Sequence, residues 1–130
     1  MTRHEAREQA FMVLFEKTFD DELTISEIVS NAEESELLKI NGFAKKLLTA
    51  VEENYDAIDE IIEKSSQSWS VLRLPKVSLA ILRLAVGEIK FVDDVPNGVA
   101  VNEAVEIAKK YGTSEDASFI NGVLGAVTRA

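Results

Sequence analysis

The sequence predicts an all-α fold of about seven helices. Apolar residues recur at spacings of three and four along almost the whole chain, as on the buried face of a helix. No stretch alternates strictly enough between apolar and polar residues to predict a strand. No linker divides the 130 residues, so we expect one domain.

Four helices are expected in the first half of the chain, over about 3–19, 24–33, 37–53 and 55–64. On the first, alanine and leucine share one face, and glutamates that include Glu8 share the opposite face. Thr24 and Glu27 have the spacing of a capping box, which predicts where the second helix begins. The third and fourth each carry leucine, valine or isoleucine along one face.

A long helix is expected to begin near Pro75 and to end near Val92. Proline suits the first turn of a helix, where a backbone N–H has no partner within the helix. The segment is apolar on most sides, and a helix of this kind is normally buried. We therefore expect this helix to be the central one.

Two more helices follow a predicted break at 93–98, where aspartate, proline and glycine cluster. The first of them is expected to stop at Gly112, because glycine is common just past a helix end. Thr113 or Ser114 is the expected cap of the last helix, which runs to about Thr128.

The charge of the chain is acidic and uneven. The net charge is −9; residues 1–65 hold 16 acids and 7 bases, whereas 66–130 hold 7 of each. Bulk charge would not attract nucleic acid, because nonspecific binding neutralises phosphates with lysine and arginine. Binding to RNA would require a local basic site or a partner protein.

Several classes of function are not expected. The chain has no cysteine and one histidine, His4, so a Cys- or His-rich metal site is not available. It lacks a Gly-rich phosphate loop, and we expect neither enzyme activity nor a cofactor. No apolar run approaches the roughly 20 residues of a membrane span, and no secretory signal opens the sequence. We expect a cytoplasmic protein.

The first candidate site is at the N-terminus. Arg3 and Arg7 lie one turn apart, on the same side of the helix as Ala10 and Leu14. Arginines on an apolar side either pair with a carboxylate of another helix or form a small cationic site, here with His4. The planar guanidinium suits RNA, because it binds phosphate through two hydrogen bonds and stacks on bases.

The second candidate is a basic stripe about 60° wide along the central helix, formed by Lys76, Arg83, Gly87 and Lys90. It is either the solvated edge of a mostly buried helix or a ledge for phosphate or an acidic partner. Gly87 would allow a close approach, because it has no side chain.

The third candidate is Lys109, Lys110 and Tyr111, at the end of the sixth helix. Lysines are favoured there by the helix dipole in any protein, but with Phe119 they also combine charge with stacking surfaces, as single-stranded RNA requires. Asn102 and Asn121 are poor choices inside helices, and we expect them to bond to backbone groups or to each other. Trp69 is expected to be a half-buried anchor.

Several of these segments resemble the NusB family of bacterial transcription antitermination factors. The pattern R-x-x-A-R-E-x-A begins at Arg3, and AILRLA at 80–85 with Glu88 resembles the central helix of the family. Near the end, VNEA at 101–104 and FINGVL at 119–124 resemble its C-terminal signature.

The resemblance implies two small helical bundles packed together, here about 1–66 and 67–130. It implies a protein without enzymatic chemistry that binds the boxA element of single-stranded nascent RNA together with NusE, a ribosomal protein. Such a protein joins the RNA polymerase elongation complex and supports ribosomal RNA transcription. Some family members self-associate, so a homodimer is also allowed.

Transferred to matching positions, the resemblance assigns RNA contacts to the opening and to the last turn and helix, at Arg3, His4, Arg7, Lys110, Tyr111, Glu115, Ser118 and Phe119. It assigns a protein partner or RNA to Lys76, Ser78 and Arg83. An alternative hypothesis is a protein-interaction adaptor of the same fold with little RNA binding of its own. A third is a regulatory domain of an RNA methyltransferase, since NusB-like domains occur attached to such enzymes.

Overall fold

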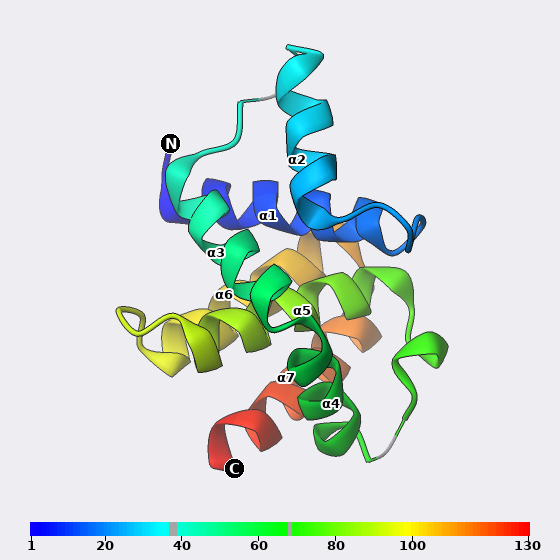
Figure 1. Ribbon diagram of the computed structural model, residues 1–130. Coiled ribbons are helices and arrows are strands. Elements are labelled where there is room, and N and C mark those ends of the chain that lie inside the picture. The colour runs from blue at the N-terminus through cyan, green and yellow to red at the C-terminus, as the bar shows by residue number, and fades with distance from the viewer. Residues whose placement is uncertain (37–38, 68) are drawn as a thin grey trace.

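The computed structural model describes residues 1–36, 39–67 and 69–130, and within them the chain forms α-helices, one 3₁₀ turn and no strand (Figure 1). The seven α-helices are α1 (Arg3–Lys17), α2 (Ile25–Glu34), α3 (Gly42–Glu53), α4 (Tyr55–Ser65), α5 (Lys76–Phe91), α6 (Asn97–Tyr111) and α7 (Ser114–Arg129). The 3₁₀ turn η1 (Val71–Arg73) precedes α5. The all-α prediction is confirmed.

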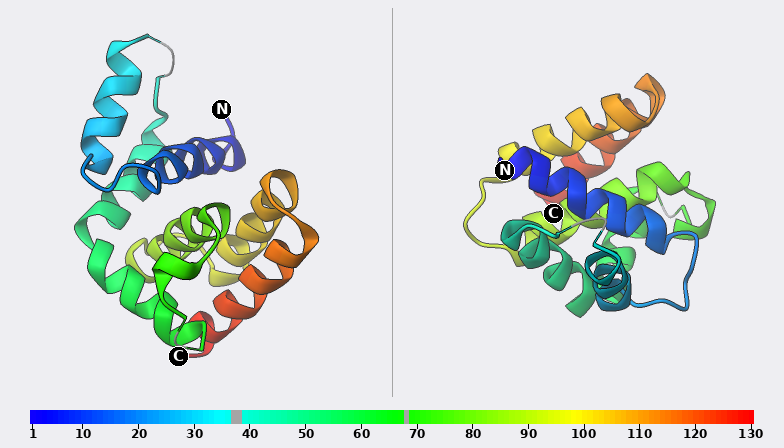
Figure 2. Two further views of the ribbon diagram at one scale, coloured as in Figure 1. Left: turned by 90° about the vertical axis from the view of Figure 1, so that its right-hand side faces the viewer. Right: turned by 90° about the horizontal axis from the view of Figure 1, so that it is seen from above.

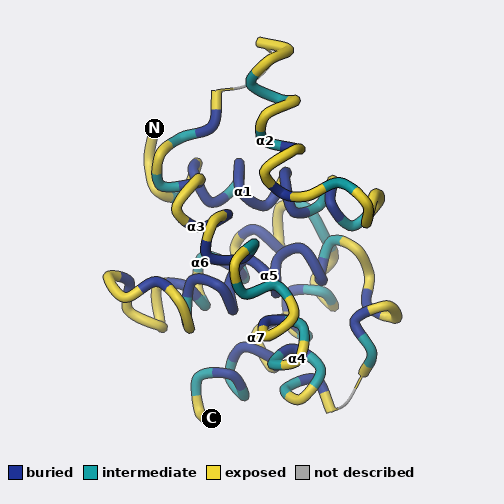
Figure 3. Tube along the Cα trace, viewed as in Figure 1, coloured by how far each residue is buried: buried dark blue, intermediate teal, exposed yellow. Residues whose placement is uncertain are grey.

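Helix α5 is the centre of the molecule, as predicted. It packs against α1, α3, α4, α6 and α7, and every residue of 78–88 is buried. Figure 3 shows this helix as a continuous buried segment between more exposed ones. Because other helices cover α5 on all sides, its sequence can be apolar nearly all round.

Capping threonines set three of the helix starts. Thr2, Thr24 and Thr113 each accept a hydrogen bond from the backbone N–H three residues later, and the acid at that position bonds back to the backbone of the threonine. Each capping box satisfies two backbone donors that would otherwise lack partners. The predicted caps at Thr24 and Thr113 are therefore confirmed.

Two helix starts differ from the prediction. Helix α3 begins at Gly42, not near residue 37, because the side chain of Asn41 accepts a hydrogen bond from Phe43 N–H and caps it there. Residues 37 and 38, on which the earlier start was predicted, lie outside the described part of the chain. Helix α6 begins at Asn97, inside the predicted break, since Pro96 supplies the entry to its first turn.

The helix contacts do not divide near residue 66. Helix α4 packs mainly on α5 and α7, so a boundary between two bundles would fall before α4 (Figure 2). Helix α2 packs mainly against α1 and α3, and its buried residues are Ile25 and Ile28. The buried apolar residues form one continuous core across all these contacts.

Gly87 on α5 allows α3 to approach closely. A Cβ atom at this position would lie 2.7 Å from Cγ2 of Val51, a distance shorter than such contacts allow. The close approach that the sequence predicted at Gly87 is therefore made by α3 of the same chain. In contrast, a Cβ atom at Gly122 on α7 would meet no atom within 4 Å.

We expect Gly87→Ala to lower the free energy of unfolding by about 1 kcal/mol, because overpacking costs more than the helix propensity of alanine returns. The matched control is Gly122→Ala, where nothing is displaced and alanine is expected to raise stability by up to about 1 kcal/mol. Urea denaturation of the two variants measures the difference. Equal stability changes in both variants would contradict the proposed contact with Val51.

Candidate functional site

Side chains of α1 and α6 meet along one side of the molecule. They touch at three levels, through the pairs His4–Glu103, Glu8–Lys110 and Phe11–Tyr111. Because residue numbers rise together along both helices, α1 and α6 run in the same direction here. We call Arg3, His4, Arg7, Glu8, Glu103, Lys110 and Tyr111 the α1–α6 junction. It brings together five of the residues predicted to bind RNA.

Arg7 lies beneath this junction in a buried ion pair. Its side chain is 3% exposed, and it donates from Nε and Nη2 to the carboxylate of Glu88, with Nη2 2.6 Å from Oε2. Its Nη1 lies 3.2 Å from Oε1 of Glu103. Burial alone would lower the pKa of Arg7, but the hydrogen bonds and charge of Glu88 outweigh it and raise the pKa. Of the two alternatives for Arg7, the structure has the ion pair, so the guanidinium is not at the surface.

Glu8 is the common partner of Lys110, Tyr111 and His4 at the surface of the junction. Its carboxylate accepts hydrogen bonds from Lys110 Nζ at 2.8 Å and from the Tyr111 hydroxyl at 2.5 Å, and it lies 3.1 Å from His4 Nε2. Burial by itself would raise the pKa of Glu8, but the hydrogen bonds from Lys110 and Tyr111 hold that pKa below its usual value. The same carboxylate raises the pKa of Lys110. Glu8 lies on the glutamate face predicted opposite the apolar one, and there it meets side chains of α6.

Arg3 lies at the outer end of the junction. Its guanidinium carbon is 4.3 Å from the centroid of the Phe43 ring, and its Nη2 is 3.5 Å from Oδ2 of Asp94. Asp94 also pairs with Lys46 on α3, at 3.3 Å. Arg3 is half-exposed, so its charge can reach a ligand more easily than that of Arg7.

The basic stripe predicted on α5 is not a continuous surface, because its middle is buried. Arg83 is buried under α4, where its Nε and Nη2 each lie 2.9 Å from a carboxylate oxygen of Asp59 and its guanidinium covers the ring of Tyr55. Burial raises the pKa of Tyr55 to about 12. Ser78 is also fully buried, and its hydroxyl lies 3.3 Å from Oδ1 of Asp116. The prediction that Arg83 and Ser78 face a partner is corrected, because α4 and α7 cover this part of α5.

Lys76, at the start of α5, is exposed, as is Lys90 at the other end of the helix. Lys76 Nζ donates to the backbone carbonyl of Thr18 at 3.3 Å and lies 5.2 Å from the ring centroid of Phe19. Phe19 is itself exposed at the end of α1. Lysine and phenylalanine therefore form a small surface where α1 ends and α5 begins.

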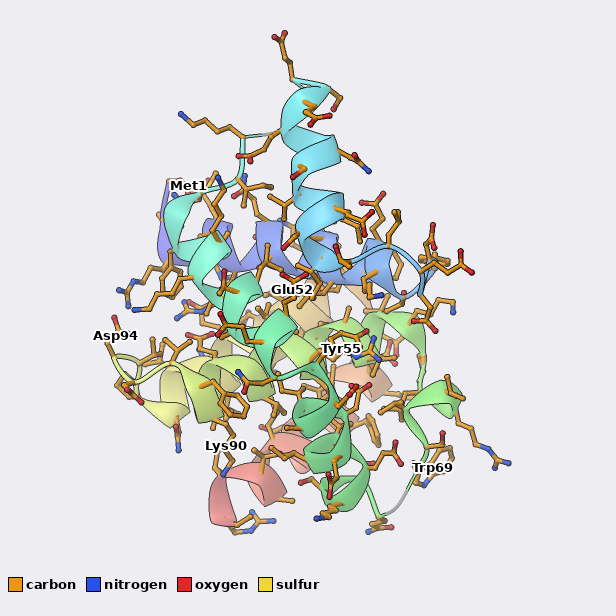
Figure 4. The ribbon with its side chains drawn as sticks, viewed as in Figure 1. Met1, Glu52, Tyr55, Trp69, Lys90 and Asp94 are labelled. Atoms are coloured by element: carbon orange, nitrogen blue, oxygen red, sulfur yellow. The ribbon has the colours of Figure 1, made fainter. Side chains whose placement is uncertain are left out.

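The three predicted residues of α7 line a groove of about 860 Å³ beside η1. Glu115, Ser118 and Phe119 form one side, and Trp69 and Pro75 contribute to the other. Trp69 is 54% exposed, so it is not the half-buried anchor that the sequence suggested. Figure 4 shows Trp69 on the opposite side of the molecule from Asp94, which marks the end of the junction near Arg3.

Asn102 and Asn121 also differ from the prediction. Both side chains are exposed and line the groove between α6 and α7, and within the described residues neither bonds to the other or to a backbone group. They lie on the outer face of the helix pair, where water satisfies their amides. Their position in helix interiors therefore has no explanation in the internal packing.

The carboxylates that hold the cations of the junction are not predicted as partners by the sequence. They are Glu8 and Glu103 of the junction and Glu88 of α5 beneath it. A signal was available, because each glutamate lies within a segment that carries the family resemblance. Their pairing depends on how three helices meet, which helix periodicity does not specify.

Metal and membrane sites have no support in the part of the chain that the structure describes. Across residues 1–36, 39–67 and 69–130, no group of three or more histidine, aspartate or glutamate side chains is arranged to hold a metal ion. No helix in the same residues combines the length and the apolar character of a membrane span.

Comparison with known proteins identifies the family. The model of the NusB family matches residues 4–129. The chain belongs to the NusB family. A curated member from Natranaerobius thermophilus, named transcription antitermination protein NusB, is 40% identical over 131 residues, which cover 98% of this chain and 94% of the relative.

Solved NusB structures have the same fold. The structure of NusB from T. maritima has a TM-score of 0.85 at 32% identity and covers 99% of this chain and 92% of its own. A crystal structure described as antitermination factors NusB and NusE in complex with dsRNA has a TM-score of 0.84 at 32% identity. The match covers 99% of this chain and 98% of the chain in that structure. The resemblance of the sequence to the NusB family is thereby confirmed.

We expect Arg7→Met to destabilise this NusB-family protein by about 3–5 kcal/mol, because it leaves Glu88 buried without its cation. Lys64→Met is the control, since Lys64 forms only an exposed pair with Glu60 and should have no measurable effect. Chemical denaturation compares the two variants with the wild type. A small effect of Arg7→Met would contradict a structural role for the buried pair.

Proposed function

We propose that this protein is an antitermination subunit that binds boxA-type single-stranded RNA together with NusE in the RNA polymerase elongation complex and supports ribosomal RNA transcription. Support comes from the curated relatives named as antitermination proteins and from the related structure of NusB with NusE and dsRNA. A cytoplasmic location goes with this function, which involves no enzymatic reaction.

The α1–α6 junction is the proposed RNA surface. The observation that carries this proposal is the meeting of His4, Lys110 and Tyr111 around Glu8, from opposite ends of the sequence, with Arg3 one residue before His4. Cations bind phosphate and an aromatic ring stacks on a base, so the group has the chemistry that single-stranded RNA requires. Arg7 supports this surface from below. Glu115, Ser118 and Phe119 would extend it across the turn into α7.

The groove beside η1 is the proposed surface for NusE. Its lining includes the exposed side chain of Trp69. Two more exposed apolar side chains follow nearby, which are Leu72 of η1, 86% exposed, and Phe19 beside Lys76. Exposed tryptophan and other large apolar side chains are typical of protein interfaces, where they supply much of the binding energy. Lys76 lies beside Phe19 and would add a charge at the rim.

One observation favours the alternative of an adaptor with weak RNA binding of its own. Every cation of the α1–α6 junction already has a carboxylate within 4 Å, and the net charge of the chain is −9. In that case NusE would supply most of the RNA affinity. A homodimer that covers the groove beside η1 would compete with NusE and would appear as a concentration-dependent mass.

RNA binding tests the proposed function. We expect a short boxA-like RNA to bind more tightly than a scrambled RNA of equal length, and NusE to strengthen this binding, as followed by fluorescence anisotropy at two salt concentrations. Lys110→Met should weaken binding roughly three- to tenfold, because one phosphate contact is lost. Lys90→Met is the control, since Lys90 is exposed at the far end of α5 and points away from α1 in Figure 4. Equal affinity for both RNAs, with and without NusE, would reject the proposal.

Partner binding is tested separately. We expect Trp69→Ser to weaken NusE binding by about thirtyfold or more in calorimetry, since truncation of a buried interface tryptophan costs at least about 2 kcal/mol. Val99→Ser is the control, because Val99 is also an exposed apolar residue but lies at the start of α6, away from η1. If both variants bind NusE like the wild type, the groove beside η1 is not the NusE surface.

A further inference from the structure

The proposed RNA surface has its cations occupied by the carboxylates of the protein itself. Lys110 is held by Glu8, Arg3 by Asp94, and His4 lies between two glutamates. Arg7 and Lys110 face the three carboxylates of Glu8, Glu88 and Glu103, and His4 contacts two of the same carboxylates. Each cation of this cluster therefore already has a carboxylate partner, with which an approaching phosphate has to compete.

These ion pairs differ in how easily they can exchange a carboxylate for a phosphate. Arg7 and Glu88 are 3% and 2% exposed, and their pair cannot open without leaving a charge buried. The side chain of Lys110 is 59% exposed, although that of Glu8 is only 15% exposed. Exposed lysines contribute little to stability through their ion pairs, so Lys110 can turn toward a new partner at small cost.

Glu8 is the carboxylate on which this exchange depends. It accepts from Lys110 and Tyr111 together, the two groups of α6 that the proposed function assigns to RNA. Glu103 is different, because it also neutralises the buried Arg7 and has a structural role. Asp94 is half-exposed, and its distances to Arg3 and Lys46 are 3.5 and 3.3 Å, so it holds its cations less closely.

We propose that Glu8 is an intramolecular competitor of RNA phosphate, holding Lys110 and Tyr111 in the free protein and releasing them when RNA binds. This inference rests on the proposed RNA-binding function. A phosphate that merely replaces Glu8 exchanges one anion for another, and the gain in free energy is small. An RNA that adds base contacts gains more, and the exchange therefore discriminates against polyanions without such contacts.

The test removes the competing charge and keeps the shape of the side chain. We expect Glu8→Gln to strengthen binding of the boxA-like RNA about three- to tenfold in fluorescence anisotropy, both alone and with NusE. Glu16→Gln is the matched control, because Glu16 is exposed on the same helix and forms no ion pair with another described residue, yet the same charge is removed. Glu16→Gln should change the affinity less than twofold.

Two further variants separate release of Lys110 from other effects. In a Lys110→Met background, Glu8→Gln should no longer strengthen binding, since there is no lysine left to release. Glu8→Asp keeps the net charge of the wild type but is one methylene too short to hold Lys110 at 2.8 Å, and it should also strengthen binding.

The outcomes distinguish this inference from the proposed function. Weaker RNA binding by Glu8→Gln would show that Glu8 positions Lys110 and Tyr111 for RNA. It would overturn the proposal that Glu8 competes with RNA phosphate. If Glu8→Gln gains no more RNA affinity than Glu16→Gln, the gain comes from the change in net charge, and competition by Glu8 is overturned. The same conclusion follows if Glu8→Gln still strengthens RNA binding in the Lys110→Met background. If the wild type binds RNA and Glu8 variants bind equally well, only the inference fails. If neither the wild type nor Glu8→Gln binds any RNA, with or without NusE, the proposed function fails and this inference with it.

Discussion

The buried guanidinium of Arg7 needs carboxylate partners, because an unpaired charge at this depth would cost several kcal/mol. Glu88 on α5 and Glu103 on α6 are those partners, so a single side chain of α1 holds that helix against two others. His4 and Glu8 are close neighbours of Arg7 on α1, and their contacts with α6 follow from the position that the ion pair sets. The charged surface of the α1–α6 junction therefore depends on the buried pair beneath it.

Buried polar pairs also fix the position of helix α5 against its neighbours in the core. Three of its polar side chains are buried, and each meets a different helix, in the pairs Ser78–Asp116, Arg83–Asp59 and Glu88–Arg7. Apolar packing alone tolerates small shifts of one helix along another, whereas a hydrogen-bonded pair requires a defined register. The close contact between Gly87 and Val51 adds a steric constraint on α3. These contacts bury α5 over residues 78–88 and leave only the ends of the helix open to a ligand.

The acidic character of the protein and its proposed RNA binding are compatible because the basic groups are gathered locally. The cations of the α1–α6 junction are neutralised in the free protein by carboxylates at contact distance. Binding then depends on exchange of these carboxylates and on base contacts, more than on long-range attraction of phosphate. Trp69, on the exposed apolar groove beside η1, lies on the opposite side of the molecule from the end of the junction near Arg3 (Figure 4). The start of α7 lines the same groove, so RNA and a protein partner would come close to each other there.

The all-α class, the central position of α5 and the caps at Thr24 and Thr113 could all be predicted from the amino-acid sequence, because helix periodicity and capping are local properties of the chain. The family motifs also indicated which segments carry function. Which charged residues reach the surface depends instead on how the helices pack. Arg83 and Lys76 belong to one predicted stripe, yet α4 covers the first and leaves the second exposed. Likewise, Arg7 could be a cationic site or half of an ion pair, and the choice depended on a glutamate 81 residues away. Pairing over such separations is set by how helices pack, which the periodicity of a single helix does not encode.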